Sequence, residues 1–122
     1  MSLMIEPKNK HTQVNGLRLH YLDWGNPKAQ PIVLLHGLQD CARSWDFLAV
    51  KMQRQYRVVA LDHRGHGDSP WASNASYKFH DYVDELGGFI ENLKLDKIIL
   101  MGHSSGGIEA ILYAAHHLKS VR

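Results

Sequence analysis

The segment GHSSGG, residues 102–107, places a serine between two glycines that each lie two positions away along the chain. The hydroxyl of Ser104 can attack a carbonyl carbon when a neighbouring base removes its proton. The pattern alone is weak evidence, because a serine in a glycine-rich loop can also cap a helix. A phosphate-binding loop is a further alternative, but the segment lacks the lysine of a Walker loop and the spacing of a dinucleotide fingerprint.

The sequence around Ser104 favours a nucleophile over these alternatives. An apolar run at residues 97–101 predicts a buried strand before it, and apolar residues at helical spacing predict a helix over 108–118. A turn that joins strand to helix at one residue crowds the positions two before and two after it. Gly102 and Gly106 occupy those positions and add no side chain. Such a turn leaves Ser104 exposed above the sheet on a strained backbone.

Acyl transfer also needs two amide donors where negative charge develops on the carbonyl oxygen. The backbone amide of Ser105, directly after the nucleophile, is the first candidate. The amide of Leu38 is the second, because the segment HGL at residues 36–38 follows another buried apolar run at 31–35. The alternative for HGL is a simple turn that ends the strand.

Composition limits the classes of protein to consider. The 122 residues carry a formal net charge of +2 and 44% hydrophobic residues, and no basic run is present, so we expect no nucleic-acid partner. One cysteine cannot form a disulfide within the chain. No apolar run approaches the roughly 18 residues of a membrane span, and the start does not resemble a signal peptide, so a cytoplasmic protein is expected. Residues 1–11 are interpreted as a tag and a flexible start.

The remaining pattern predicts one α/β domain. A hairpin is expected over residues 12–21, with Asn15 and Gly16 in the turn. Buried strands and helices then alternate, with strands at 31–35, 57–61 and 97–101 and helices at 44–56, 77–93 and 108–118. This alternation predicts a parallel sheet with helices on both faces. The loops after the three buried strands should converge at one edge of that sheet.

Three segments together resemble the alpha/beta-hydrolase family: HGL at 36–38, DHRGHGDS at 62–69 and GHSSGG at 102–107. Their order and spacing match, and the resemblance covers nearly the whole chain. It implies an alpha/beta-hydrolase fold, with a mostly parallel sheet and helices on both faces, of which these residues form only the N-terminal half. Residues 62–69 resemble a structural turn of the family, so we assign them no chemistry.

The resemblance is to the serine-nucleophile branch of the family, which includes esterases and lipases. It implies Ser104 as the nucleophile and the backbone amides of Leu38 and Ser105 as the oxyanion hole. A serine argues against the haloalkane dehalogenase and epoxide hydrolase branches, which place Asp at this position. Carbon–carbon bond hydrolases and cofactor-free haloperoxidases also carry serine there.

Six further residues in or near these loops are expected to border the substrate: His36, Gly37, Gln39, Asp40, Trp45 and His103. His63 and His66, with Asp62 and Asp68 nearby, could be drawn as a metal site. They lie three residues apart in a loop broken by glycine and lack a convincing ligand set. We therefore expect neither a metal nor a cofactor.

The base that would activate Ser104 is missing from these residues. The family's triad runs Ser, then Asp or Glu, then His, and after Ser104 the chain offers only Glu109, His116 and His117. The two histidines lie roughly 18–20 Å along the helix axis, too far to reach the hydroxyl. We interpret residues 1–122 as the N-terminal portion of a single hydrolase domain. Its lid, catalytic acid and His base would lie in a missing C-terminal part.

The predicted function is hydrolysis of a carboxylic ester or related small-molecule acyl substrate through an acyl-enzyme on Ser104, as in carboxylesterases. Water would release the acyl group with the help of the absent His, so the 122-residue segment alone should be inactive. Two kinds of alternative stay open. One is a carbon–carbon bond hydrolase or cofactor-free perhydrolase on the same fold. The other is a non-catalytic hydrolase-like fragment in which the turn is only architecture.

Overall fold

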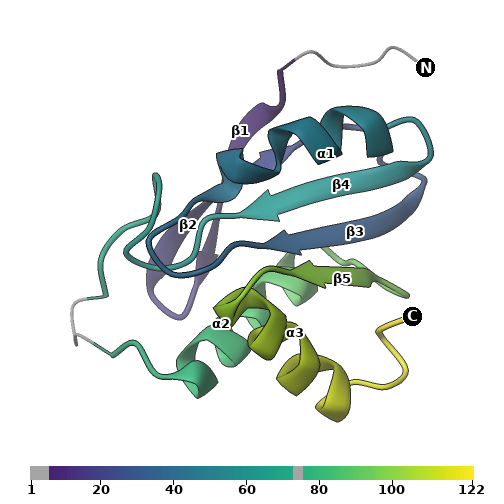
Figure 1. Ribbon diagram of the computed structural model, residues 1–122. Coiled ribbons are helices and arrows are strands. Elements are labelled where there is room, and N and C mark those ends of the chain that lie inside the picture. Colours follow the sequence, from purple (N-terminus) through teal and green to yellow (C-terminus); the bar gives the residue numbers. More distant parts are fainter. Residues whose placement is uncertain (1–5, 73–75) are drawn as a thin grey trace.

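A mixed five-stranded sheet forms the centre of the computed structural model, which describes residues 6–72 and 76–122 (Figure 1). Its strands are β1 Lys8–Val14, β2 Leu17–Asp23, β3 Gln30–Leu35, β4 Tyr56–Leu61 and β5 Ile99–Gly102. They lie side by side in the order β1-β2-β4-β3-β5. β3 pairs in parallel with β4 and β5, whereas β2 pairs antiparallel with β1 and β4. β2 alone therefore runs against the others, which confirms a mostly parallel sheet.

Helices cover both faces of the sheet, as expected. They are the 3-10 turn η1 Ala42–Trp45 and the helices α1 Asp46–Met52, α2 Phe79–Asn92 and α3 Ser105–His116. α1 lies on one face, and α2 and α3 lie on the other (Figure 1). The helix expected over 44–56 is shorter, because Tyr56 already pairs with Gln30 in the sheet. None of the described helices has the length and apolar character that crossing a bilayer requires.

The predicted hairpin is confirmed, and its first strand is longer than expected. Asn15 and Gly16 both have positive φ, 49° and 81°, as the tight turn between β1 and β2 requires. β1 begins at Lys8, so residues 8–11 belong to the sheet and the flexible start expected there is wrong. Pairing with all of β2 and a 2.8 Å ion pair from Lys10 Nζ to Asp23 hold this segment. Residues 1–5 of the expected tag lie outside the described residues.

Two apolar clusters pack on the two faces of β3 and β4. Val33 and Leu35 face the cluster under α2 and α3, while Ile32 and Leu34 face the cluster under α1. Successive side chains of a strand point to opposite faces. The continuous apolar run at 31–35 therefore fills both clusters, as expected for a strand that is buried on both sides.

The outer edge of β5, away from β3, is only briefly paired within the described residues. Val121 forms an isolated parallel bridge with Ile98, whose N–H donates to the Ser120 carbonyl at 2.8 Å. The Ile98 carbonyl accepts from the Arg122 amide at 2.7 Å. Leu100 of β5 is partly exposed beyond this bridge.

Candidate active site

Two residues, His103 and Ser104, join β5 to α3, and Ser104 directly precedes the helix. Its backbone has φ 57° and ψ −118°, a combination outside the regions that non-glycine residues ordinarily adopt. Holding a residue there costs about 1–3 kcal/mol, and such strain concentrates at functional sites. α3 begins at Ser105, three residues earlier than expected, and the Gly107 amide donates to the Ser104 carbonyl at 2.9 Å. The strand therefore passes into the helix within two residues, His103 and Ser104.

The two glycines that flank Ser104 make this turn sterically possible. A Cβ atom added to Gly102 would lie closer than 3.0 Å to the backbone of Gly106. One added to Gly106 would lie equally close to the carbonyl oxygens of Leu35 and His36. These neighbours are backbone atoms, which cannot rotate away as a side chain can. The steric role expected of both glycines is confirmed.

Replacing Gly106 by alanine is therefore expected to lower the free energy of unfolding by about 1–3 kcal/mol or more, as overpacking does. Gly107→Ala is a matched control, because its Cβ would lie 3.4 Å from the nearest backbone atom, in ordinary contact. Alanine there also favours the helix over glycine. Urea unfolding of the full-length protein measures both variants. Equal effects of the two substitutions would contradict the steric account.

The loop after β3 packs directly against the Ser104 turn, so the predicted convergence of the loops is confirmed. A Cβ atom on Gly37 would lie 3.3 Å from the Ser104 Cβ and 3.2 Å from the His103 carbonyl oxygen. The amide of Ala42, at the end of this loop, donates to Asp62 Oδ1 at 2.7 Å. Within the described residues, the amides of Leu38 and Ser105 donate to no other group.

His36 holds the loop after β3 in place through two hydrogen bonds of its ring. Its side chain is buried, and its Nε2 accepts a hydrogen bond from the His63 amide at 3.1 Å. The proton must then be on Nδ1, which donates to the Gly37 carbonyl at 2.7 Å. Burial lowers the pKa of His36 and favours this neutral form. His36 thus fixes the loop that carries the Leu38 amide.

A cavity of about 110 Å³ lies beside the two candidate oxyanion donors. Gly37, Leu38 and Ser105 line one part of it, and Phe79 and Tyr82 at the start of α2 line another. Three of the expected site residues therefore meet at one cavity. Ser104 is exposed at the neighbouring turn.

The other residues expected at the substrate lie outside the lining of this cavity. Gln39, with φ 60°, lies in the loop but does not line the cavity, and neither does Asp40 or the exposed His103. Trp45 packs against the apolar cluster under α1, which also contains Ala49. Its position at the end of η1 directs it to that face of the sheet, so it does not border the cavity.

His63 and Glu109 line the same cavity, although the sequence did not indicate them as a pair. His63 Nε2 and Glu109 Oε2 lie 3.1 Å apart, and the two residues are 4% and 2% exposed. Burial lowers the pKa of His63 well below its usual 6.5 and raises the pKa of Glu109 well above its usual 4.5. Burial therefore favours the neutral form of each group.

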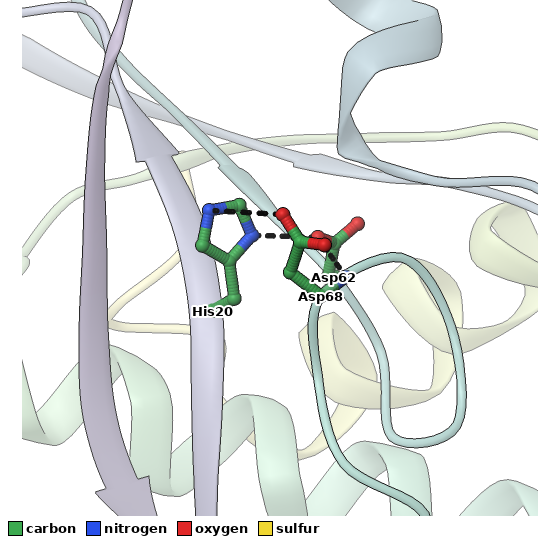
Figure 2. A group of neighbouring side chains, drawn as sticks. All are labelled: His20, Asp62 and Asp68. Carbon is green, nitrogen blue, oxygen red and sulfur yellow. Dashed lines mark hydrogen bonds and ion pairs between the residues drawn. The ribbon is translucent and has the colours of Figure 1, made fainter.

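A second buried histidine, His20, joins the loop after β4 to the sheet (Figure 2). His20 Nδ1 donates to Asp62 Oδ2 at 2.6 Å, and its Nε2 lies 2.8 Å from Asn9 Oδ1 and 4.0 Å from Asp68 Oδ2. Asp62 also accepts from the amide of Asp68 at 3.1 Å. Hydrogen bonds within the protein thus already occupy these buried atoms. They fasten the loop, which is the structural role expected of this segment.

The sequence matches a family model for the alpha/beta hydrolase fold over residues 30–122. The chain is 37% identical over 106 residues to a non-heme chloroperoxidase of Burkholderia pyrrocinia, covering 86% of this chain and 38% of that protein. It is 37% identical over 101 residues to epoxide hydrolase 4 of Mus musculus, covering 82% and 28% of the two chains. The chain therefore spans about two fifths, or less, of the length of these relatives.

Two further proteins widen the comparison. The bifunctional esterase/perhydrolase DCH of Acinetobacter calcoaceticus is 33% identical over 107 residues, 87% of this chain and 38% of that protein. The crystal structure of a membrane phospholipase A superposes with a TM-score of 0.92 at 32% identity, over 96% of this chain and 38% of that chain. Fold and sequence agree, and the chain belongs to the alpha/beta hydrolase family.

Proposed function

We propose that the protein is a serine hydrolase that cleaves a carboxylic ester or related acyl substrate through an acyl-enzyme on Ser104. The observation that carries this proposal is the backbone of Ser104, held at φ 57° and ψ −118° between β5 and α3 with Gly37 packed against it. A relative whose name is esterase/perhydrolase supports the choice of reaction. The serine argues against epoxide opening, the activity named for another relative.

In this mechanism Ser104 Oγ attacks the ester carbonyl carbon while its proton passes to a base. The carbonyl oxygen becomes an oxyanion, which accepts hydrogen bonds from the amides of Leu38 and Ser105. The C–O bond to the alcohol then breaks, and the base returns the proton to the leaving alkoxide oxygen. Water, deprotonated by the same base, attacks the acyl-enzyme and restores the Ser104 hydroxyl as the acid leaves.

The base and its orienting acid are proposed to lie in the part of the hydrolase beyond these 122 residues. His116 and His117 stand at the far end of α3 from Ser104, and the Glu109 carboxyl is buried against His63. The chain also covers only 38% of the chloroperoxidase to which it is similar. The isolated segment is accordingly expected to be inactive.

A fluorophosphonate probe tests the proposal, because it forms a covalent bond with an activated serine. Full-length protein should be labelled at one equivalent, on the peptide that contains Ser104, and Ser104→Ala should abolish labelling. Ser44→Ala is the control, since the Ser44 side chain is exposed on η1 and its hydroxyl donates to the Cys41 carbonyl. Intact-mass and peptide-mass measurements read the result. A folded full-length protein that takes up no probe would overturn the proposal in favour of a non-catalytic role.

Perhydrolysis is a second candidate, because a chloroperoxidase and an esterase/perhydrolase are among the relatives. In that reaction hydrogen peroxide replaces water in the attack on the acyl-enzyme at Ser104 and releases a peracid. Peracid formation from an ester and hydrogen peroxide, lost in Ser104→Ala, would support it. Hydrolysis of aryl esters without peracid formation would exclude perhydrolysis and support the esterase activity.

A further inference from the structure

The cavity beside Leu38 and Ser105 has the size of a short hydrocarbon chain. A cavity of roughly 150 Å³ in another protein holds benzene. A volume of about 110 Å³ therefore accommodates a chain of roughly four or five non-hydrogen atoms by the same measure. A longer or bulkier group exceeds this space, so the cavity sets an upper limit on the size of the group that fills it.

Carbon atoms make up most of the surface that the cavity presents. Leu38, Phe79 and Tyr82 contribute aliphatic and aromatic groups. His63 and Glu109 also line the cavity, but both ring nitrogens of His63 and Oε1 of Glu109 are buried away from it. Moving a charged group from water into such surroundings is costly, whereas burying hydrocarbon there is favourable. The lining therefore selects an uncharged hydrocarbon group.

The cavity is closed at its inner end and open at its mouth. Tyr82, His63 and Glu109 are buried and close the inner end. Leu38 and Phe79 also line the cavity and are 68% and 44% exposed, so they border the mouth. A chain that enters between them meets buried side chains at the inner end. The cavity therefore limits the length of the chain as well as its volume.

The position of the cavity relates it to one part of an ester. Leu38 and Ser105 carry the candidate oxyanion amides, so the cavity adjoins the carbonyl group that these amides would bind. The carbonyl carbon attacked by Ser104 carries an acyl chain and an alcohol. The alcohol leaves and water takes its place, whereas the acyl chain stays attached to Ser104 until hydrolysis. A cavity that is closed at its inner end suits the acyl chain, because that group need not depart before water attacks.

We propose that this cavity is the acyl subsite and holds a hydrocarbon chain of up to about four or five carbon atoms beyond the carbonyl. The inference rests on the proposed acyl transfer at Ser104. The substrates are then esters of short aliphatic acids. An ester of a long-chain acid leaves the remainder of its chain outside the cavity and gains nothing from the additional length.

The test is a series of aryl esters that share one leaving group and differ in acyl chain, from ethanoate to decanoate. For full-length protein, kcat/KM should rise about fourfold with each added CH₂, the effect of burying one such group. The rise should end at pentanoate or hexanoate, and longer chains should react no faster because their additional carbons stay in water.

Phe79→Ala should move this limit to longer acyl chains, because it removes one wall of the cavity. Phe47→Ala is the matched control, since Phe47 is 91% exposed on α1, on the opposite face of the sheet, and should leave the limit in place. If Phe79→Ala instead changes the selectivity among ethanoates of different alcohols, and not among acyl chains, the cavity holds the leaving group and the proposal is wrong.

A binding measurement separates this inference from the proposed function. The unreactive amides from ethanamide to octanamide are titrated into full-length Ser104→Ala protein, with ligand-observed NMR as the readout. Affinity that rises up to pentanamide or hexanamide, with a limit that Phe79→Ala moves, supports the subsite even if no ester is hydrolysed and the proposed function fails. Ester hydrolysis without a chain-length limit, or with one that Phe79→Ala leaves in place, overturns the subsite and leaves the proposed function intact. Equal affinity for all the amides without hydrolysis overturns both.

Discussion

Ser104→Ala is expected to lower kcat for ester hydrolysis by the full-length protein by roughly 10⁴-fold or more, the loss typical when a catalytic serine is removed. The hydroxyl at the strained turn is the atom that forms and breaks the acyl bond. Alanine removes it and leaves the amides of Leu38 and Ser105 in place. KM should change little, because the substrate contacts stay. Steady-state kinetics with an aryl ester measures both constants.

The control for this experiment is again Ser44→Ala, which should keep kcat within about twofold, as a surface substitution away from a site does. The residual rate of Ser104→Ala would still exceed that of the uncatalysed reaction, since the oxyanion donors and binding contribute on their own. If Ser104→Ala keeps more than a tenth of the wild-type kcat, another group attacks the ester. The proposed mechanism would then be wrong.

The strand-to-helix turn could be predicted from sequence because its determinants are local. At this turn β5, α3 and the carbonyl of Leu35 lie so close together that residues 102 and 106 have no room for a Cβ atom. The glycines at these two positions, each two residues from Ser104, are visible in the sequence. The convergence of the loop at Gly37 with this turn followed from strand order alone, since parallel strands end at one edge. Local spacing and sheet topology thus identified the residues that meet at Ser104.

The His63–Glu109 pair could not be predicted in the same way. The two residues lie 46 positions apart in the sequence, and residues 62–69 already had a structural explanation. The spacing of apolar residues in α3 also gave a misleading indication of its buried side. The apolar side includes Ile111, which is 71% exposed, so this side faces outward in the described chain. The inward stripe is Gly106, Glu109 and Tyr113. Glu109 is the one acidic residue on that stripe, and a carboxyl at an inward position of the helix was the signal that could have identified it.

The course of the chain was predictable where apolar runs are continuous and less so at the ends of elements. β3, β4 and β5 begin and end within two residues of the expected bounds. β1 was missed before residue 12, because its exposed polar residues give little alternation and only its pairing with β2 defines it. Tertiary pairing therefore decided what the residue pattern left open.

Glu85→Ala is expected to lower the free energy of unfolding by about 3–5 kcal/mol, because it leaves a buried charge unpaired. Arg64 Nε donates to Glu85 Oε1 at 3.0 Å, and both side chains are almost fully buried. Arg64 also donates to the Ser76 carbonyl at 3.0 Å. Through these bonds α2 and the segment that precedes it hold the loop that carries His63. Urea unfolding of the full-length protein at pH 5 to 8 measures the change.

The pH dependence of this loss has a defined sign. Burial raises the pKa of Glu85 above its usual 4.5, although Arg64 acts in the opposite direction. A carboxyl with a higher pKa in the folded state binds its proton more tightly there. Its contribution to stability is complete below the unfolded pKa and declines as the pH rises above it. The deficit of Glu85→Ala should therefore be larger at pH 5 than at pH 8.

Two controls determine whether burial of the unpaired charge causes the loss. Arg43→Ala breaks exposed ion pairs with Glu6 and Asp46, at 2.9 and 3.0 Å, and should cost less than about 1 kcal/mol. Replacing both partners, Arg64→Met with Glu85→Leu, removes the charge and the carboxyl together and should cost less than Glu85→Ala alone. If the double variant is the least stable, the hydrogen bonds to Arg64 matter more than its charge. Because those bonds also hold the loop, the cavity beside Ser104 would then depend on them directly.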